Sequence, residues 1–331
     1  MIGPIPIRVQ VPGLANGPDL FIAAWLFAPA RSELRHPVTV VYAFPGGGYS
    51  KSYYHMEIPG RSGYSMATYL VGRGMIVIVC DPLATGESSR PRPPEALTWE
   101  VVADANDHAV SSTLDRLRKG ELMPSHGRID PQSVIGLGHS LGAGLVTVQQ
   151  ARRKAFSGLV LLGRSIGATH VPAPPDALHP EGTWRELAAQ HDEVAASTLV
   201  DGYPVQSRRT EWQRYLFYWH DVPEDVIVTD TSLASTMPLE VARELAAPQG
   251  PNAKAAAAVD VPILLGFGER DVSRDPLAEP RAYRSATDIS VFVLRGSGHC
   301  HNLAATRQIL WSRVARWIET IAVDERPVVT S

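Results

Sequence analysis

Two kinds of hydrophobic pattern alternate along most of the chain. Short runs of apolar, often β-branched residues predict buried strands, because a parallel strand covered on both faces is apolar at nearly every position. These runs lie at residues 38–44, 75–80, 133–138, 158–163, 261–267 and 289–294. Between them, apolar residues recur at spacings of three and four, most clearly at 98–119 and 302–321, as in amphipathic helices. The alternation predicts an α/β domain with a mostly parallel central sheet and helices on both faces.

The amino-terminal region follows a different pattern. Residues 4–12 and 20–30 are typical of two strands, and Asn16-Gly17 lies between them. Both residues of this dipeptide tolerate positive φ, which favours a tight hairpin turn. We therefore expect an antiparallel hairpin at the start of the sheet.

One long interval interrupts the alternation. Residues 166–257 contain no buried-strand run, and segments rich in proline, glycine and alanine bound a helical middle. Structureless loops of this length are rare in compact domains. The sequence therefore predicts a mainly helical cap at 166–257, inserted between two parts of one core, residues 1–165 and 258–331.

Composition and charge narrow the kind of partner. The 331 residues are 44% hydrophobic and 20% charged, with a formal net charge of −3 and no basic run, so we expect a small-molecule substrate and no nucleic acid. The start of the chain lacks a signal-peptide pattern, and no apolar run approaches the roughly 18 residues of a membrane span. With only Cys80 and Cys300, a reducing, cytoplasmic location without membrane insertion is expected. The sequence allows a homodimer without fixing the oligomeric state.

The stretch SVIGLGHSLGAG, residues 133–144, places Ser140 between a predicted strand and a predicted helix. A serine in such a sharp turn presents its Oγ at the carboxyl end of the sheet, and side chains two residues before and after it would collide. Gly138 and Gly142 meet that requirement. The amino terminus of the following helix would then direct backbone N–H groups toward a developing oxyanion.

These residues and the order of the strands resemble the α/β-hydrolase superfamily, specifically its capped serine hydrolases of the esterase and lipase type. The resemblance implies a nucleophile, an acid and a histidine in that chain order. It places the histidine after the last strand, in RGSGHCHN, where His299 follows a glycine and His301 is the rival. It places the acid after the 261–267 strand, in GERD, where Asp271 is favoured over Glu269.

The resemblance also implies that the loop after residue 44 contributes to an oxyanion hole. That loop reads PGGGYS, and glycines allow backbone N–H groups to approach a substrate oxygen closely. Gly47 is the expected donor together with the N–H of Leu141. Because the loop begins Pro45-Gly46 where many relatives have His-Gly, Gly46 and Gly48 remain alternatives.

Other candidate residues receive different roles. Asp81 lies in CDPLATGESS, which resembles a loop of the same family, and is expected to hold that loop in place. His299 and His301 flank Cys300, but the sequence offers no further cluster of metal ligands beside them. Neither a metal nor a cofactor is therefore expected. Residues with apolar or aromatic surface are the candidates for a substrate pocket beneath the cap: Phe44, Tyr49, Trp212, Tyr215 and Trp219.

A serine at the turn, where haloalkane dehalogenases and epoxide hydrolases carry an aspartate, points to acyl transfer. We expect hydrolysis of a small or medium, largely apolar carboxylic ester, thioester or lactone. A carbon–carbon bond hydrolase of a diketone uses the same residue types and is the main alternative. A ligand-binding protein that only retains the fold is the other.

Overall fold

The fold is built around one eight-stranded sheet in the order β1-β2-β4-β3-β5-β6-β11-β12. The computed structural model describes residues 2–13, 20–167, 169–175, 182–183, 198–205, 208–238, 240–241 and 250–324. The strands of the sheet are β1 (Ile2–Val11), β2 (Leu20–Ala28), β3 (Thr39–Phe44), β4 (Ile76–Cys80), β5 (Ser133–His139), β6 (Gly158–Leu162), β11 (Ile263–Gly268) and β12 (Ile289–Leu294).

The sheet is parallel from β4 through β12 and antiparallel at its amino-terminal edge. β3 pairs in parallel with both β4 and β5, and β11 pairs in parallel with both β6 and β12. β1 and β2 form an antiparallel hairpin, and β2 runs antiparallel to β4. The predicted mostly parallel sheet with an antiparallel hairpin is confirmed. The predicted turn at Asn16-Gly17 lies outside the described residues.

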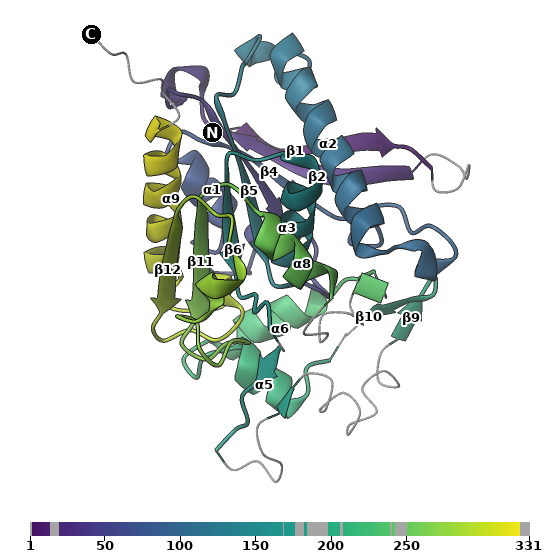
Figure 1. The fold of residues 1–331 in the computed structure, drawn as a ribbon, viewed down its shortest axis with the longest axis vertical. Helices are drawn as coiled ribbons and strands as arrows, with labels where there is room; N and C mark the ends of the chain where they lie inside the picture. The colour runs from purple at the N-terminus through teal and green to yellow at the C-terminus, as the bar shows by residue number, and fades with distance from the viewer. Residues whose placement is uncertain are drawn as a thin grey trace.

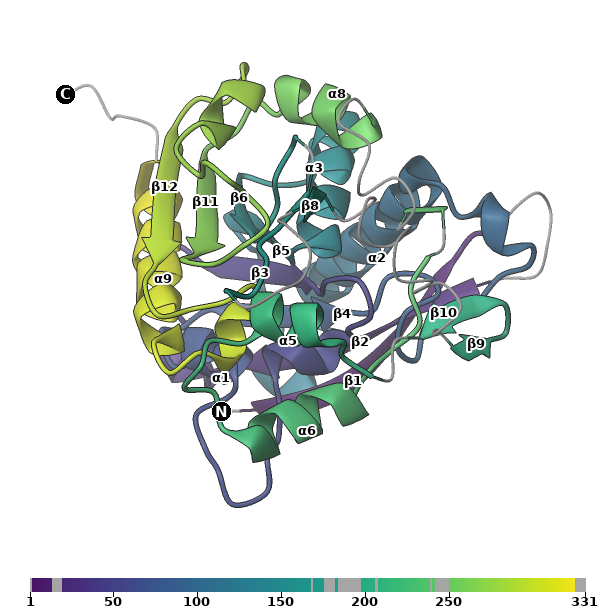
Figure 2. The same ribbon diagram turned by 90° about the horizontal axis from the view of Figure 1, so that it is seen from below.

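Helices cover both faces of the sheet, as predicted (Figure 2). One face carries α1 (Met66–Val71) and α9 (Arg307–Asp324), and the other carries α2 (Trp99–Lys119), α3 (Leu141–Arg153) and α8 (Pro251–Ala258). Successive side chains of a strand point to opposite faces. Accordingly, Tyr42 joins the hydrophobic cluster on the α2–α3 side, and Val41 joins the cluster on the α1–α9 side.

The described part of the segment between β6 and β11 contains short strands and helices. The strands are β7 (His170–Val171), β8 (Gly182–Thr183), β9 (Thr198–Val200) and β10 (Tyr203–Val205), and the helices before α8 are α5 (Glu211–Phe217) and α6 (Glu224–Ser232). Figure 1 shows α5 and α6 at the end of the molecule toward which the arrowheads of β11 and β12 point. α8 instead packs along α3. The predicted boundary at residue 257 falls within α8.

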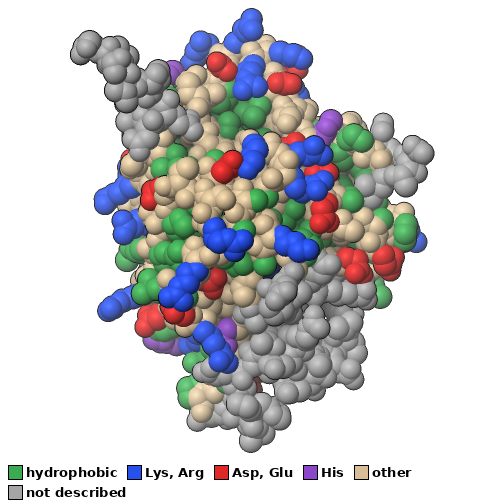
Figure 3. Space-filling model, viewed as in Figure 1, with side chains coloured by type: hydrophobic (Ala, Val, Ile, Leu, Met, Phe, Trp, Pro, Cys, Tyr) green, Lys and Arg blue, Asp and Glu red, His purple; other side chains and the backbone are tan. Residues whose placement is uncertain are grey.

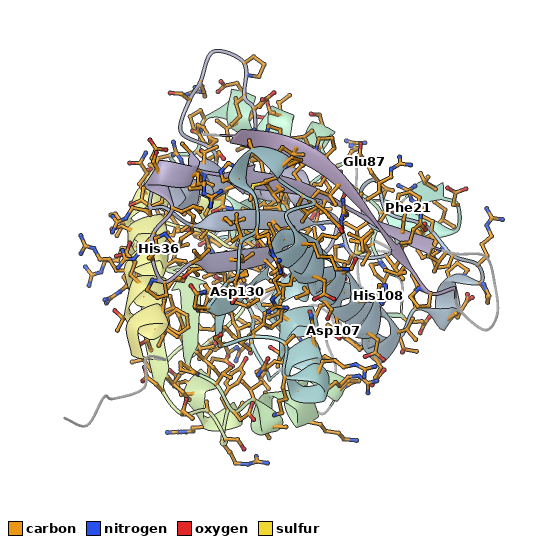
Figure 4. The ribbon with its side chains drawn as sticks, turned by 90° about the horizontal axis from the view of Figure 1, so that it is seen from above. Phe21, His36, Glu87, Asp107, His108 and Asp130 are labelled. Atoms are coloured by element: carbon orange, nitrogen blue, oxygen red, sulfur yellow. The ribbon has the colours of Figure 1, made fainter. Side chains whose placement is uncertain are left out.

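The loops that precede the strands lie at the end of the sheet opposite α5. Figure 4 views the end away from α5, where His36 and Asp130 lie in the loops that precede β3 and β5. In Figure 3, which views the molecule from the same side as Figure 1, acidic and basic side chains are interspersed over the described surface. Among the described residues, no helix has the length and apolar character needed to span a membrane.

Candidate active site

Ser140 occupies a sharp turn between β5 and α3. Its backbone has φ 52° and ψ −116°, a conformation that non-glycine residues rarely adopt. A Cβ at position 138 would lie 2.4 Å from the Cα of Ala143, and one at position 142 would lie 2.2 Å from the carbonyl oxygen of Phe44. The two flanking glycines are therefore required by close backbone contacts, as the sequence predicts.

Asp271 and His299 are brought together from the loops that follow β11 and β12. Nδ1 of His299 lies 2.6 Å from Oδ1 of Asp271, and both side chains are buried. The backbone N–H groups of Gly268 and Val272 also donate to the carboxylate, each at 2.7 Å. With Nδ1 directed at the carboxylate, Nε2 of His299 is the nitrogen left to exchange a proton.

A second histidine contacts the same carboxylate. Nε2 of His301 lies 2.7 Å from Oδ2 of Asp271, and the His301 side chain is buried. Burial alone would raise the pKa of Asp271, but His299 and His301, with their hydrogen bonds, hold it well below its usual range. Asp271 is therefore a carboxylate shared by two imidazoles. Glu269, the alternative acid, instead accepts a hydrogen bond from the N–H of Gly296 at 2.8 Å.

Gly163 places the nucleophile and the histidines side by side. The N–H of Ser140 donates to the carbonyl of Leu162 at 2.8 Å, and the next residue, Gly163, has a φ of +59°. A Cβ on Gly163 would lie 3.0 Å from the Nδ1 and Cε1 atoms of His299 and 3.2 Å from Cε1 of His301. In the described residues no hydrogen bond joins Ser140 Oγ to His299, and such contacts often form only when substrate binds.

His139, directly before Ser140, is hydrogen-bonded to the loop that carries His299 and His301, which we call the histidine loop. Its Nε2 lies 2.9 Å from the carbonyl oxygen of His299, and its ring stacks on Tyr53 with centroids 4.6 Å apart. Burial, reinforced by His299 and His301, holds the pKa of His139 well below its usual range. A neutral His139 therefore donates its Nε2–H to that carbonyl.

Neither His139 nor Gly163 was singled out by the sequence reasoning. Each had a signal: His139 is a polar residue at the end of an apolar strand, and Gly163 is a glycine directly after one.

The glycine loop after β3 borders the nucleophile. A Cβ on Gly47 would lie 3.4 Å from Cδ1 of Leu141, and one on Gly46 would lie 3.2 Å from Cβ of Ser140. The N–H groups of Gly47 and Leu141 donate to no other described residue. The same holds for Gly46 and Gly48, so the loop offers several candidate donors beside Ser140.

Two parts of the segment between β6 and β11 reach this site. The last carbonyls of α5, on Leu216 and Phe217, accept hydrogen bonds from the N–H groups of His299 at 2.8 Å and Cys300 at 2.9 Å. After α6, the N–H of Ser235 donates to the carbonyl of Gly48 at 2.9 Å. This segment is therefore bonded to the histidine loop and to the glycine loop.

A buried polar cluster lies at the same junction. Oδ2 of Asp230, on α6, accepts hydrogen bonds from the hydroxyls of Tyr49 at 3.0 Å and Tyr218 at 2.5 Å, and the guanidinium of Arg209 lies 3.8 Å away. Burial raises the pKa of Asp230, although Arg209 opposes the rise. The hydroxyl of Tyr49 also lies 3.1 Å from Sγ of Cys300. Sequence reasoning missed this cluster, because Tyr49 and Cys300 are far from Asp230 in the chain.

The five residues expected to line a substrate pocket have different surroundings. Phe44 belongs to the hydrophobic core on the α2–α3 side, and Trp212 belongs to the other core cluster. Tyr49 is part of the buried polar cluster around Asp230. The rings of Tyr215 and Trp219 both face the guanidinium of Arg270, at 3.7 and 4.7 Å from their centroids. Their contact with substrate stays a prediction.

Asp81 has the structural role that the sequence predicts. Its carboxylate accepts hydrogen bonds from the backbone N–H and the ammonium group of Lys51, at 2.6 and 2.7 Å, and from the N–H of Glu87 at 3.0 Å. The side chains of Asp81 and Lys51 are both buried. The contact ties the loop after β4 to the segment after the glycine loop. As for metals, the described residues contain no group of three or more histidine, cysteine, aspartate or glutamate side chains placed to hold an ion.

Comparison with known proteins identifies the family of the chain. Residues 40–310 match the model of a family described as the alpha/beta hydrolase family. A search of curated protein sequences gives no match.

Solved structures share the fold at low sequence identity. A thermophilic esterase from Thermogutta terrifontis has a TM-score of 0.62 and 15% identity, covering 96% of this chain and 99% of its own. An E-2-(acetamidomethylene)succinate hydrolase has a TM-score of 0.60 and 17% identity, with 95% and 100% covered. A thioesterase domain from the curacin biosynthetic pathway has a TM-score of 0.55 and 14% identity, with 96% and 99% covered. At these identities the similarity establishes the fold alone.

Proposed function

Because the chain belongs to the alpha/beta hydrolase family, we propose that it is a serine hydrolase that cleaves a carboxylic ester, thioester or lactone through an acyl-enzyme on Ser140. One observation carries the proposal. Ser140 sits in a turn with positive φ that two glycines make possible, and the buried Asp271–His299 pair lies beside it, across Gly163. A serine hydroxyl is a weak nucleophile at neutral pH, and it needs a base held in one orientation.

The acylation step follows from these positions. Ser140 Oγ attacks the carbonyl carbon of the substrate while its proton passes to Nε2 of His299. Asp271 holds the ring by Nδ1 and stabilises the imidazolium that forms. The carbonyl oxygen becomes an oxyanion, which in this proposal accepts hydrogen bonds from the N–H groups of Leu141 and of the glycine loop, with Gly47 as the chosen donor. Collapse of this intermediate breaks the bond to the alcohol or thiol, which leaves with the proton from His299.

Deacylation repeats the chemistry with water. His299 accepts a proton from a water molecule as its oxygen attacks the acyl carbon, and then returns the proton to Ser140 Oγ as the acid is released. Both steps use the same donors for the oxyanion. The cycle ends with the free enzyme, a carboxylic acid and an alcohol or thiol.

The substrate is proposed to be small or medium in size and largely apolar. α5 and the residues after α6 contact the loops that carry His299 and Gly48, which supports a role as the roof of the site. Aromatic side chains are frequent in these elements, including Trp212 and Phe217. A pocket of this kind holds its ligand mainly by apolar contact.

Two other functions use the same residues. A carbon–carbon bond hydrolase of a diketone needs a nucleophile, a base and an oxyanion site in a similar arrangement. A ligand-binding protein of this fold needs none of them to be reactive. The buried Asp271–His299 pair, with its costly desolvated carboxylate, favours a catalytic protein over a binding one.

Labelling with a fluorophosphonate probe tests the proposal. The wild-type protein should react at a single serine, and Ser140→Ala should abolish the labelling while the thermal unfolding curve stays close to wild type. A matched control is Ser165→Ala, because Ser165 is a buried serine three residues beyond Leu162. Absence of labelling in the folded wild-type protein would favour the ligand-binding alternative.

A substrate panel then separates the two enzymes. p-Nitrophenyl acyl esters, a thioester and a lactone represent acyl transfer, and a vinylogous diketone represents carbon–carbon cleavage. We expect turnover of the first group, lost in Ser140→Ala. Turnover of the diketone alone would establish the alternative reaction.

A further inference from the structure

Arg164 is a buried cation that directly follows Gly163, the residue that borders the rings of His299 and His301. β6 ends at Leu162, Gly163 abuts the rings of His299 and His301, and Arg164 follows directly. Only 5% of the Arg164 surface is exposed. Arg164 is therefore one residue in the chain from the position that borders the His299 ring, and its side chain is buried in the protein.

No protein group neutralises this cation within the described residues. Arg164 makes no hydrogen bond or ion pair with them, and its buried Nε has no partner. Burial lowers the pKa of Arg164 to about 10, while Tyr283 and Glu279 oppose that shift, so the group stays charged at neutral pH. Both oxygens of Glu279 already accept hydrogen bonds, from the N–H of Ile166 at 3.0 Å and the hydroxyl of Ser273 at 2.5 Å.

Packing against an aromatic ring does not replace a counter-ion. The guanidinium carbon lies 5.9 Å from the ring centroid of Trp99, which is at the outer limit of a cation–π contact. Buried charges in proteins are normally paired, because removing them from water is costly. An arginine that is 5% exposed and has no hydrogen-bonded or ion-paired partner among the described residues therefore indicates that something else approaches it.

Trp99, whose ring faces the Arg164 guanidinium, and Asn252, which meets Trp99 at Gly144, also have unused polar groups. Nε1 of Trp99 and both amide atoms of Asn252 are buried without a hydrogen-bond partner in the described residues. These two side chains meet at Gly144, where an added Cβ would lie 2.8 Å from Cζ3 of Trp99 and 2.7 Å from Oδ1 of Asn252. We call Arg164, Trp99 and Asn252 the Arg164 cluster.

The Arg164 cluster lies against the first turn of the nucleophile helix. The N–H of Gly144 donates to the carbonyl of Ser140 at 3.2 Å, so Gly144 is one helical turn from the nucleophile. On its other side the cluster is one residue from Gly163 and the His299 ring. The Arg164 cluster is therefore next to the helix that follows Ser140 and follows the residue that borders the His299 ring.

We propose that the Arg164 cluster binds a carboxylate group carried by the substrate, at the end away from the bond that is cleaved. The guanidinium of arginine matches a carboxylate with two parallel hydrogen bonds. The indole N–H of Trp99 and the amide N–H₂ of Asn252 are further donors, and an anion can use all of them. This inference rests on the proposed function and specifies its substrate as a half-ester or related acid: a largely apolar molecule with one anionic end.

Matched pairs of esters test the proposal on either side of the scissile bond. p-Nitrophenyl hemiglutarate and p-nitrophenyl valerate differ by a carboxylate in the acyl group. 4-Acetoxybenzoate and its methyl ester differ by a carboxylate in the leaving group. For one of the pairs we expect kcat/KM of the wild-type protein to be about 10- to 100-fold higher for the acid, the range expected for charged hydrogen bonds.

The arginine itself is tested by Arg164→Met, which keeps the length of the side chain and removes its charge. We expect the preference for the acid to disappear, with hydrolysis of the neutral esters changed less than about 3-fold. Arg152→Met is the matched control, because it removes an exposed arginine that is paired with Asp104. That variant should keep the wild-type preference.

A binding measurement separates this role from a structural one. Millimolar glutarate should raise the Tm of the wild-type protein and of Ser140→Ala, and should not raise the Tm of Arg164→Met. Without glutarate, Arg164→Met should be at least as stable as wild type, because an unpaired buried charge has been removed.

Two results would overturn the proposal. One is equal kcat/KM for both members of both ester pairs. The other is a preference for the acid that survives in Arg164→Met. In either case hydrolysis of the neutral esters and labelling of Ser140 would still establish the proposed function, so the two conclusions fail separately.

Discussion

Nε2 of His301 lies 2.7 Å from Oδ2 of Asp271, while Oδ1 of the same carboxylate faces His299 at 2.6 Å. Both histidines were candidates for the base from the sequence. The structure brings both to one acid, so their roles are distinguished by which ring has a nitrogen directed to Ser140. Gly163 borders both rings, and the carbonyl of its neighbour Leu162 accepts a hydrogen bond from the N–H of Ser140.

We predict that His299→Ala and His301→Ala have very different effects. His299→Ala should lower kcat by roughly 10³- to 10⁴-fold, because the base is lost. His301→Ala should retain turnover, within about 10-fold of wild type, because His301 only donates to Asp271. Near-complete loss of turnover in His301→Ala, with His299→Ala active, would reverse the assignment.

A second prediction concerns the acid. Asp271→Asn should lower kcat by about 10³-fold or more, because an amide cannot hold the productive tautomer of His299 or stabilise its charged form. Glu269→Gln is the matched control, since the Glu269 carboxylate accepts a hydrogen bond only from the N–H of Gly296 among the described residues. Its kcat should stay within a few-fold of wild type. Steady-state kinetics with a p-nitrophenyl ester provide the comparison.

Gly163→Ala should damage catalysis through crowding. The new methyl group would lie 3.0 Å from the His299 ring, at a residue whose φ of +59° already disfavours alanine. We expect kcat to fall by about 10-fold or more, because displacement of the base by a fraction of an ångström disrupts proton transfer. Gly167→Ala is the control, because the nearest atom to its added methyl group is Oγ of Ser165 at 3.7 Å. Equal kcat values for the two variants would show that the His299 ring has room to move.

His139 should make the protein sensitive to mild acid. Its pKa is well below 6.5 in the folded state, so below about pH 6.5 the unfolded chain binds a proton that the folded protein does not. Stability is therefore retained above that pH and lost as the pH falls, by up to about 1.4 kcal/mol per pH unit until the folded-state pKa is reached. Urea unfolding from pH 7 to 5 should show a smaller decline in His139→Gln. The exposed residue His220 supplies the control, and His220→Gln should decline like wild type.

The acyl-length dependence tests the apolar roof. Each methylene that the site accommodates should raise kcat/KM by about 4-fold, the factor that corresponds to about 0.8 kcal/mol, until the pocket is full. A series of neutral p-nitrophenyl esters from acetate to decanoate measures it. Equal kcat/KM values across the series would show that α5 and the residues after α6 do not enclose the acyl chain.

The fold was largely predictable because most strands of the parallel sheet are buried on both faces. Runs such as 75–80 and 158–163 consist of apolar residues and glycine, and each lies within one residue of an observed, fully buried strand, β4 and β6. The last helix begins later than its pattern indicates, at Arg307 instead of 302. Residues 301–303 form a 3₁₀ turn instead, because His301 is bonded to Asp271 and the amide of Asn302 to the carbonyl of Tyr53.

The candidate site was predictable only where chemistry follows a short motif. Ser140, Asp271 and His299 each follow a strand in a recognisable local sequence. The second contact of His301 and the placement of Arg164 depend on side chains that meet from separate loops. No local pattern encodes those meetings, since a buried arginine and an exposed one look alike in a sequence. The same is true of Tyr49, which lies 181 residues before Asp230 in the chain and meets both Asp230 and Tyr218 in the folded protein.

The bonds from His299 and Cys300 to α5 have a consequence for how this protein can change. Their acceptors are the main-chain carbonyls of Leu216 and Phe217, so the side chains at those positions can vary while the two hydrogen bonds persist. The helix end itself cannot vary so freely, because a Cβ on Gly298 would lie 2.7 Å from each of those carbonyl oxygens. A segment from another protein grafted in place of α5 would therefore have to end a helix at the same position relative to the N–H groups of His299 and Cys300. Replacement of single side chains can therefore change this segment without loss of the two hydrogen bonds. Exchange of the whole segment would break them and release the loop that carries His299.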